Sequence, residues 1–398
     1  MKGGITGAQG ASMRSLAFTV YVPTFLLSTG SGAMSTFLPL YLRSMGASVG
    51  LAATIIGVGM AGILVFDLPS GFITARYGER LSITVSSVVM VFAALLIGAS
   101  GSLWLAGLGI FLTHGAASFW FLGRLTSMRN ALPTRQRGRG LATAGGVLRI
   151  GQLCGPIAGG YLAAGSGYRA VFFATAALVA ASLICFLLSD RAGQRSVPAG
   201  PAPLPALAAV FMAKRRVFAT AGVSMILLSL VRAGRGLILP LWGQGIGLET
   251  SAIGLIAGLS SAADTLMFYP AGVLSDRAGR KWSAISCMII ISAGVALVPL
   301  TSDFPSLLVV GLLIGLGNGL GSGINMTLAA DFAKGTETGI FLGLWRLVTD
   351  IGAAGAPLLV GLVAEIFALG PATLVVAAFG FLGAAFHGLF VEETLERR

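Results

Sequence analysis

The feature that most constrains the fold is a series of twelve long apolar stretches. Each is close to the ~20 residues that an α-helix needs to cross ~30 Å of hydrocarbon. The stretches lack strand-like alternation, and backbone polar groups in lipid must be satisfied within a segment, which favours helices. Only 10% of the residues are charged, and the mean hydropathy is +0.91. We therefore predict an all-α membrane protein with twelve transmembrane helices, at about 15–41, 49–73, 80–100, 103–128, 139–164, 168–188, 216–242, 250–275, 281–301, 305–330, 337–364 and 371–391.

The positive charge orients these helices. With both termini placed in the cytoplasm, most of the 26 Lys and Arg residues fall on that side, whereas Arg43 and Arg169 fall outside. This is the positive-inside bias, so the net charge of +12 implies no nucleic-acid partner. We expect a multi-pass protein of a cell inner (cytoplasmic) membrane with both termini in the cytoplasm.

The chain is a duplicated six-helix unit. A proline-rich polar segment at 189–216 divides the stretches six and six, which predicts an N-terminal half at 1–188, an extended cytoplasmic linker, and a C-terminal half at 217–398. A constant offset of 201 residues aligns the two halves. It pairs Pro39 with Pro240, Gly71 with Gly272, Arg76 with Arg277, Gly78 with Gly279, Gly138 with Gly339, Gly151 with Gly352, and Pro156 with Pro357. Parallel repeats of this kind place a substrate site between the halves, near the bilayer midplane.

The loop GVLSDRAGRK, 272–281, resembles the signature loop of the major facilitator superfamily. Its first-half counterpart, GFITARYGER, has Ala75 where that family usually has Asp. The resemblance covers essentially the whole chain and implies two pseudo-symmetric halves that alternate in access. We expect Asp276 to accept hydrogen bonds or to cap a neighbouring helix, so that the loop locks the halves in one state, unless it only anchors the topology. The conformational residues are Gly71, Arg76, Gly78, Arg80, Gly272, Asp276, Arg277, Gly279 and Arg280.

A second motif indicates the direction of transport. GQLCGPIAGG, 151–160, resembles the antiporter motif of exporters in the same superfamily. Its small residues, with Gly155 and Pro156 at the centre, are typical of a bent helix that packs closely between the halves. Glycine and proline are also common in membrane helices generally, so a purely structural role is the alternative.

Ionisable residues inside the spans are the main functional candidates, because each is costly in lipid unless it is paired or hydrated. The family arrangement implies that span 2 packs against span 11 and span 5 against span 8. Arg149 would then pair with Asp264, and Asp67 with Arg346 as an inner gate. A pair that must separate can also couple a proton, since protonating the carboxylate removes the attraction. We predict gate or proton-coupling roles for Asp67, Arg149, Asp264, Arg346 and Asp350, with static packing as the alternative.

Arg232 and Arg235 lie about one helical turn apart in span 7, which the family arrangement places on the cavity. Without enough acidic residues to neutralise them, they favour a substrate with a carboxylate or phosphate group. Alternatively, they pair with Asp350 or helix carbonyls, or extend to the outer interface. We expect the substrate to contact Arg232, Arg235, His114, Phe119, Trp120 and Asn325. His387, near the end of span 12, is expected to be peripheral.

No phosphate loop, metal-ligand cluster or nucleophile motif is present in the sequence, so we expect neither an enzyme nor a metal or cofactor. Without an ATPase motif, the energy must come from a gradient. We predict a monomeric exporter of a small organic compound, either an anionic metabolite or an amphipathic drug, by proton antiport. A proton-coupled uptake symporter and, remotely, a non-transporting receptor or scaffold are the alternatives.

Overall fold

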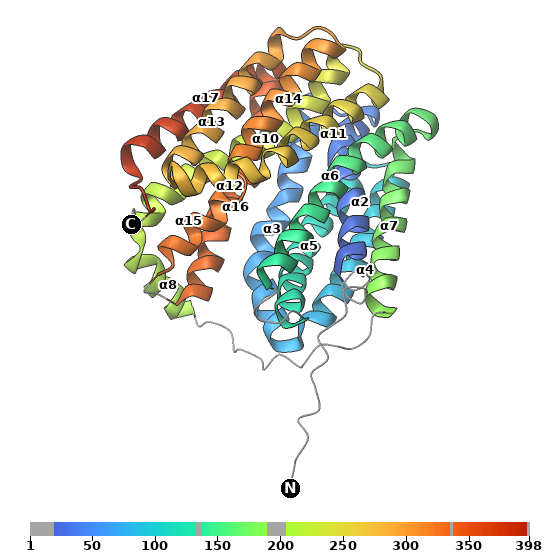
Figure 1. Cartoon of the computed structure of the whole chain (residues 1–398). Helices are drawn as coiled ribbons and strands as arrows, with labels where there is room; N and C mark the ends of the chain where they lie inside the picture. Colours follow the sequence, from blue (N-terminus) through green and yellow to red (C-terminus); the bar gives the residue numbers. More distant parts are fainter. Residues whose placement is uncertain (1–19, 132–136, 189–203, 335–336, 396–398) are drawn as a thin grey trace.

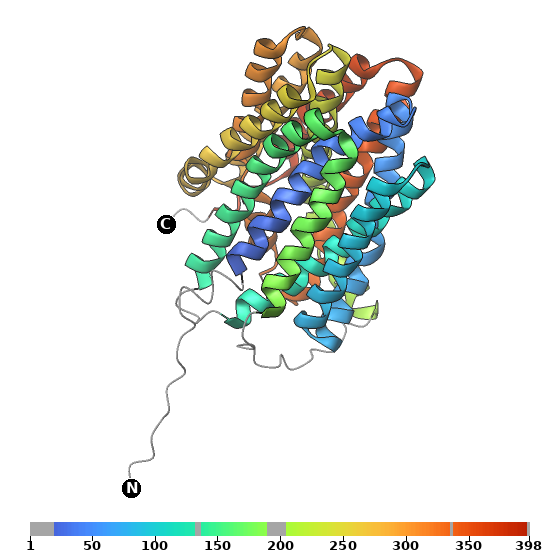
Figure 2. The same cartoon turned by 90° about the vertical axis from the view of Figure 1, so that its right-hand side faces the viewer.

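The computed structural model describes residues 20–131, 137–188, 204–334 and 337–395, and the regular structure in these ranges is helical. The first group contains α2 (Val22–Ser44), α3 (Val49–Tyr77), α4 (Glu79–Ala99), α5 (Leu103–Ala131), α6 (Arg137–Ser166) and α7 (Tyr168–Leu188). The second group contains α10 (Val223–Gly245), α11 (Thr250–Leu266), α12 (Phe268–Arg277), α13 (Arg280–Leu297), α14 (Phe304–Leu320), α15 (Ile324–Phe332), α16 (Thr338–Ile366) and α17 (Leu369–Phe390). Two short helices, α8 (Leu204–Ala213) and α9 (Arg215–Val217), precede the second group. Figures 1 and 2 show the two groups side by side.

The prediction of an all-α membrane protein is confirmed. Ten helical segments in the described part of the chain are long and apolar enough to cross a membrane. The other two long helices, α2 and α6, have 23 and 30 residues but are rich in Gly, Ser and Thr. Small residues let these two helices approach their neighbours closely, and both pack tightly within the first group.

Two of the predicted continuous spans are broken. The stretch at 250–275 forms α11 and α12, which meet at Met267. Pro270 lies three residues later, and a proline ring clashes with the carbonyl four residues earlier and donates no hydrogen bond to it. The stretch at 305–330 forms α14 and α15, which are separated at 321–323. Gly323, directly before α15, has a φ of +79°, a left-handed conformation that interrupts the helical path.

The linker is only partly as predicted. Residues 189–203 lie outside the described residues, but the end of the predicted extended linker forms α8. Its sequence, LPALAAVFMA, is rich in good helix formers, and Pro205 stands in the first turn, where proline is tolerated. Phe211 of α8 stacks on Phe218 with ring centroids 5.1 Å apart, so α8 is attached to the second group. We retain 1–188 and 217–398 as the proposed halves.

The offset of 201 residues recurs in the backbone and in the packing. Gly78 and Gly279, which begin equivalent helices, both have positive φ, +86° and +110°. A Cβ at Gly151 of α6 would meet the carbonyl oxygen of Phe25, and a Cβ at Gly352 of α16 would meet that of Ile226, 201 residues later. The α2–α6 contact in the first half therefore repeats as the α10–α16 contact in the second.

The most extensive contacts between the two halves follow two lines, with a smaller contact between α2 and α10. One joins α3 to α16, where Gly57 approaches Leu358 and the Ser48 hydroxyl donates to the Glu365 carboxylate at 2.5 Å. The other joins α6 to α11, where a Cβ at Gly254 would meet the Pro156 carbonyl. We call these the α3–α16 seam and the α6–α11 seam. The ribbons of the halves diverge toward the end of the bundle that carries α8 (Figure 1).

Candidate functional site

The α6–α11 seam contains the predicted ion pair between the halves. Arg149 of α6 lies with its Nη1 2.9 Å from Oδ1 of Asp264 in α11. The two side chains are only 20% and 14% exposed, so solvent screens the pair weakly. The Arg149 guanidinium also lies 4.9 Å from the ring centroid of Phe268, the first residue of α12. The structure thus brings together two residues that are 115 positions apart in sequence.

Asp264 has further partners from the second half. Asn318 of α14 donates its Nδ2 to Asp264 Oδ2 at 2.7 Å. Arg235 of α10 lies 3.9 Å from the same oxygen, as an ion pair. One carboxylate therefore faces two guanidinium groups, one from each half.

Arg232 uses the break between α14 and α15. Its Nη2 donates to the carbonyl oxygen of Gly321 at 2.9 Å, and Arg149 donates to the Ser322 hydroxyl at 2.9 Å. Both acceptors lie at 321–323, where the helix is interrupted. For Arg232, the alternative of a contact with helix carbonyls is present. For Arg235, the alternative partner was Asp350, but the carboxylate that it pairs with is Asp264.

We call Arg149, Arg232, Arg235, Asp264 and Asn318 the arginine cluster. It holds three guanidinium groups and one carboxylate, so its ionised form carries a net charge of +2. The Nε atoms of Arg232 and Arg235 are buried and make no hydrogen bond with the described residues, and the same holds for Oδ1 of Asn318. The cluster therefore has unused donors and an unneutralised positive charge.

The α3–α16 seam contains the second predicted pair. Arg346 of α16 lies 3.0 Å from Asp67 Oδ1 in α3 and 3.4 Å from Asp350 Oδ2, one turn further along its own helix. Asp67 is 7% exposed, and the Arg346 guanidinium lies 4.8 Å from the ring centroid of Phe121. We call Asp67, Arg346 and Asp350 the carboxylate cluster. With two carboxylates and one guanidinium, its ionised form carries a net charge of −1.

Two aromatic residues of α5 that we expect to contact the substrate pack within the first half. Trp120 is 7% exposed and packs against Leu27 and Ile83. Phe119 contacts Phe66 of α3, with centroids 6.0 Å apart. Consecutive helical residues point about 100° apart, so the two rings have different neighbours.

Two further candidate substrate contacts lie elsewhere. His114 bonds through Nδ1 to the Ile110 carbonyl of its own helix at 2.9 Å. Asn325 accepts from the Trp345 indole at 2.7 Å, which joins α15 to α16 within the second half. His387 is also not peripheral as expected: it is fully buried and bonds to the Ser224 hydroxyl at 2.7 Å, because its turn of α17 faces the start of α10.

Sequence reasoning missed Asn318 and Ser322. The available signals were an amide in an otherwise apolar run and the Gly-Ser-Gly sequence at 321–323, which is typical of a helix break. Neither signal indicates a partner, because Asn318 and Ser322 form their hydrogen bonds with residues of other helices.

The signature loop makes its contacts within the second half. Arg280 pairs with Asp276 at 3.3 Å and with Asp331 of α15 at 3.7 Å. Glu393, after α17, accepts from the backbone N–H groups of Arg280 and Lys281 at 2.9 and 3.1 Å. Capping of the adjacent helix is thus done by Glu393, whereas Asp276 is 74% exposed on the loop. Of the two contacts expected of Asp276, helix capping is made by Glu393 instead, because the segment after α17 folds back onto this end of the bundle, while Asp276 pairs with Arg280.

The first-half loop is simpler. Arg76 lies 5.6 Å from the Tyr77 ring centroid, and Arg80 donates to the Leu187 carbonyl at 3.3 Å. The exporter-type motif serves two contacts at once: a Cβ at Gly155 would meet the Thr29 carbonyl of α2, while the Pro156 carbonyl approaches Gly254 in the α6–α11 seam. Movement of α6 therefore has to change both contacts.

Comparison with known proteins gives one family. The family model described as Major Facilitator Superfamily matches residues 20–234 and 221–398. The chain is 28% identical over 286 residues to the multidrug resistance protein MdtG of Citrobacter koseri, which covers 67% of this chain and 68% of that protein. A POT family transporter in complex with a thioalcohol-conjugated peptide superimposes with a TM-score of 0.81 at 13% identity, covering 96% of this chain and 97% of that one. A D-xylose–proton symporter superimposes with a TM-score of 0.74 at 15% identity, covering 96% and 98%.

Proposed function

Because the chain belongs to the Major Facilitator Superfamily of membrane transporters, we propose that it exports a small organic anion in exchange for protons. The observation that carries this proposal is the arginine cluster, in which one carboxylate pairs with a guanidinium from each half and a third guanidinium binds the neighbouring helix break. The cluster lies between the two halves of a fold that works by moving one half against the other.

The charge of the cluster supports an anionic substrate. A buried cation without a partner is unfavourable in a membrane, and a carboxylate or phosphate would neutralise the surplus and accept from the free Nε donors. The helix break adds to this, because α15 begins at Ile324 beside the cluster and the first N–H groups of a helix favour anions. Substrate binding would compete with Asp264 for Arg235 and Arg149.

The carboxylate cluster is the proposed proton site. Asp67 and Asp350 share Arg346, and like charges at short distance favour protonation of one carboxylate. Protonation of Asp67 would remove its attraction to Arg346 and weaken the α3–α16 seam. Proton binding on this seam and substrate binding on the other would then favour different arrangements of the halves.

A second candidate substrate is an amphipathic drug, and the observation that favours it is the similarity to the multidrug resistance protein MdtG. In that case the arginine cluster holds the halves together and the substrate lies on apolar surface. The exporter-type motif in α6 favours export over uptake. We also propose that the protein is a monomer with both termini in the cytoplasm.

The test is the melting temperature of the purified protein with a panel of anionic and cationic organic compounds, because a ligand that binds only the folded state raises it. Wild type is compared with Arg235→Gln, with Arg235→Lys, and with Arg215→Gln as the control on the exposed α9. We expect anions to stabilise wild type and the control, with most of the effect lost in Arg235→Gln.

The transport of each stabilising compound is then measured in liposomes that contain the protein, where an imposed pH gradient must drive its uptake or release. Equal stabilisation of all variants by hydrophobic cations would overturn the anion proposal and favour the drug. No movement of any stabilising compound under a pH gradient would contradict proton coupling.

A further inference from the structure

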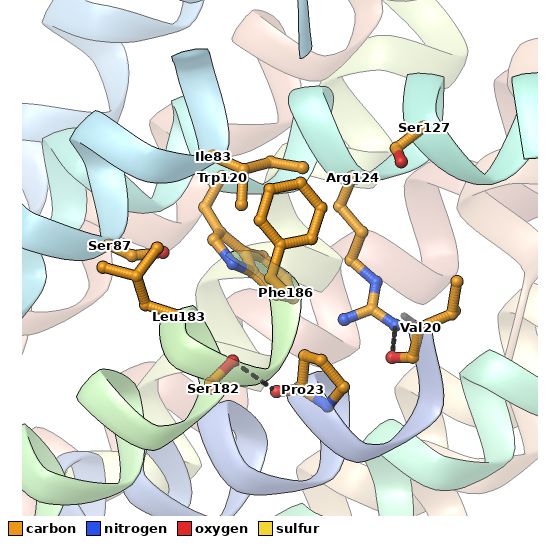
Figure 3. A pocket seen from close by; sticks show the side chains of 10 residues that line it. All are labelled: Val20, Pro23, Ile83, Ser87, Trp120, Arg124, Ser127, Ser182, Leu183 and Phe186. Carbon is orange, nitrogen blue, oxygen red and sulfur yellow. Dashed lines mark hydrogen bonds between the residues drawn. The ribbon is translucent and has the colours of Figure 1, made fainter. Parts of the chain in front are cut away.

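A third arginine site lies inside the first half and shares no residue with the two seams; its Arg124 is half-buried. Arg124 of α5 reaches into a pocket between α2, α4, α5 and α7 (Figure 3). Its Nη2 donates to the Val20 carbonyl at 2.9 Å, and its guanidinium lies 4.8 Å from the centroid of the Trp120 ring. The pocket belongs to no contact between the halves.

Arg124 has no carboxylate partner among the described residues. Arg149, Arg235 and Arg346 each lie within 4 Å of a carboxylate, whereas Arg124 and Arg232 form no ion pair with any described residue. The one hydrogen bond of Arg124 among these residues uses a single donor of the five that a guanidinium has. Within the described part of the chain, its positive charge and its other donors are therefore left for a ligand.

The lining combines hydroxyl groups with apolar side chains. The hydroxyl groups come from α4, α5 and α7. They belong to Ser87, Ser127 and Ser182, and the apolar members are Val20, Pro23, Ile83, Trp120, Leu183 and Phe186. Ser182 donates to the Pro23 carbonyl at 2.8 Å, as Figure 3 shows, so its oxygen remains an acceptor. Such a lining suits a ligand with an anionic head and an apolar tail.

The pocket lies near one end of four helices. Pro23 stands at the start of α2, Ile83 in the second turn of α4, Arg124 two turns before the end of α5, and Phe186 in the last turn of α7. At 1.5 Å per residue, Arg124 is about 10 Å from the end of α5. Arg124 therefore lies near one end of its membrane-spanning segment, Leu103–Ser127, as expected of a residue that meets lipid headgroups.

The surface next to the pocket is suited to lipid. Large apolar side chains on the outer faces of α4 and α7 are exposed, among them Val85, Val88, Ile184 and Leu188. Arg80, which is exposed at the same end of α4, donates to the Leu187 carbonyl and adds a second positive charge near the pocket; the acidic Glu79 precedes it. An acyl chain could lie along α4 and α7 while the headgroup reaches Arg124.

We propose that this pocket binds the phosphate group of an anionic phospholipid, with Arg124 as the main ligand and the serine hydroxyls as further partners. The bound lipid ties α2, α4, α5 and α7 together at one membrane interface. The site stabilises the first half and is independent of the transported substrate.

The experiment measures the melting temperature of the detergent-purified full chain during titration with dioctanoyl phosphatidylglycerol. Dioctanoyl phosphatidylcholine serves as the lipid without net charge, and glycerol 3-phosphate as the soluble headgroup. Wild type is compared with Arg124→Gln, and with Arg215→Gln, which removes one positive charge at the same end of the bundle but outside the pocket. We expect phosphatidylglycerol to raise the melting temperature of wild type and of Arg215→Gln, with an apparent dissociation constant about tenfold larger in Arg124→Gln, the loss that follows from one charge-assisted hydrogen bond.

Two results would overturn the proposal. One is an unchanged response of Arg124→Gln to phosphatidylglycerol. The other is a response to glycerol 3-phosphate at the same concentrations, which would assign the pocket to a soluble phosphate compound. If Arg124→Gln does not fold, Leu183→Trp fills the half-buried rim of the pocket and keeps the guanidinium. This variant should lose the lipid response, and retention of the response would equally reject the site.

Discussion

Arg149 in α6 and Asp350 in α16 occupy equivalent positions of the two repeats, 201 residues apart, and carry opposite charges into the two seams. Arg149 pairs with Asp264 across the α6–α11 seam, whereas Asp350 shares Arg346 with Asp67 at the α3–α16 seam. The duplicated fold thus holds two clusters of opposite net charge. In the proposed exchange of an anion for protons, each ligand would meet a cluster of the opposite sign.

Asp264 should be essential for stability without substrate. Asp264→Asn leaves Arg149 and Arg235 without their carboxylate, and breaking a buried ion pair on one side costs about 3 to 5 kcal/mol. The matched change Asp276→Asn removes a carboxylate that is 74% exposed, and such surface pairs contribute about 0 to 1 kcal/mol. Thermal melting of both variants in the same detergent checks the difference. Equal melting temperatures would show that the arginine cluster is hydrated rather than buried.

Substitutions of Asp350 and Asp67 should differ in their effects on proton coupling and on the stability of the α3–α16 seam. Asp350→Asn keeps the 3.0 Å pair between Arg346 and Asp67, so the protein should remain folded, but one of two proton-accepting carboxylates is lost. Asp67→Asn removes the contact between the halves itself. We expect reduced proton movement per substrate in the first variant and a lower melting temperature in the second. A pH-sensitive dye inside liposomes measures the first effect, and proton movement equal to wild type in both variants would remove these residues from the coupling.

Replacement of Gly352 and of Gly355 in α16 by alanine should have different effects on the free energy of unfolding. A Cβ at Gly352 would meet the Ile226 carbonyl of α10, whereas a Cβ at Gly355 has open space. Gly352→Ala should therefore destabilise the protein by about 1 to 3 kcal/mol through overpacking. Gly355→Ala should be neutral or stabilise it by up to about 1 kcal/mol, since alanine is the better helix former. Parallel denaturation of the two variants tests the repeated α10–α16 contact, and it fails if Gly352→Ala is as stable as Gly355→Ala.

Glu393 should stabilise the signature loop. Glu393→Gln removes a charged acceptor from the first N–H groups of α13, an effect of about 0.5 to 2 kcal/mol for a helix cap. Glu392→Gln is the control, because its side chain is 91% exposed and its Arg216 partner lies 3.9 Å away. Hydrogen exchange of the amides at 280–281 should accelerate in the first variant alone. Similar exchange in both would mean that the segment after α17 does not hold the loop.

Several residues show how far sequence reasoning reached. The pairing of Arg149 with Asp264 and of Arg346 with Asp67 followed from the family arrangement and the depth of each charge, and the structure brings both pairs together. Trp120 was misplaced because its contacts are set by the angle of α5 within the first half. His387 was misplaced because a position near a helix end does not reveal whether another helix covers it.

The sequence by itself determined the membrane environment, the helical class, the repeat and the depth of each ionisable residue. These follow from properties that act along the chain: the length of an apolar run, the need to satisfy backbone groups in lipid, and the register of repeated glycines and prolines. Only the tertiary structure decided that α11–α12 and α14–α15 are broken helices, that Arg232 binds the Gly321 carbonyl, and that Arg124 has no carboxylate partner among the described residues. Those facts depend on which helix faces meet, and rotation of a helix by one residue, about 100°, changes every partner.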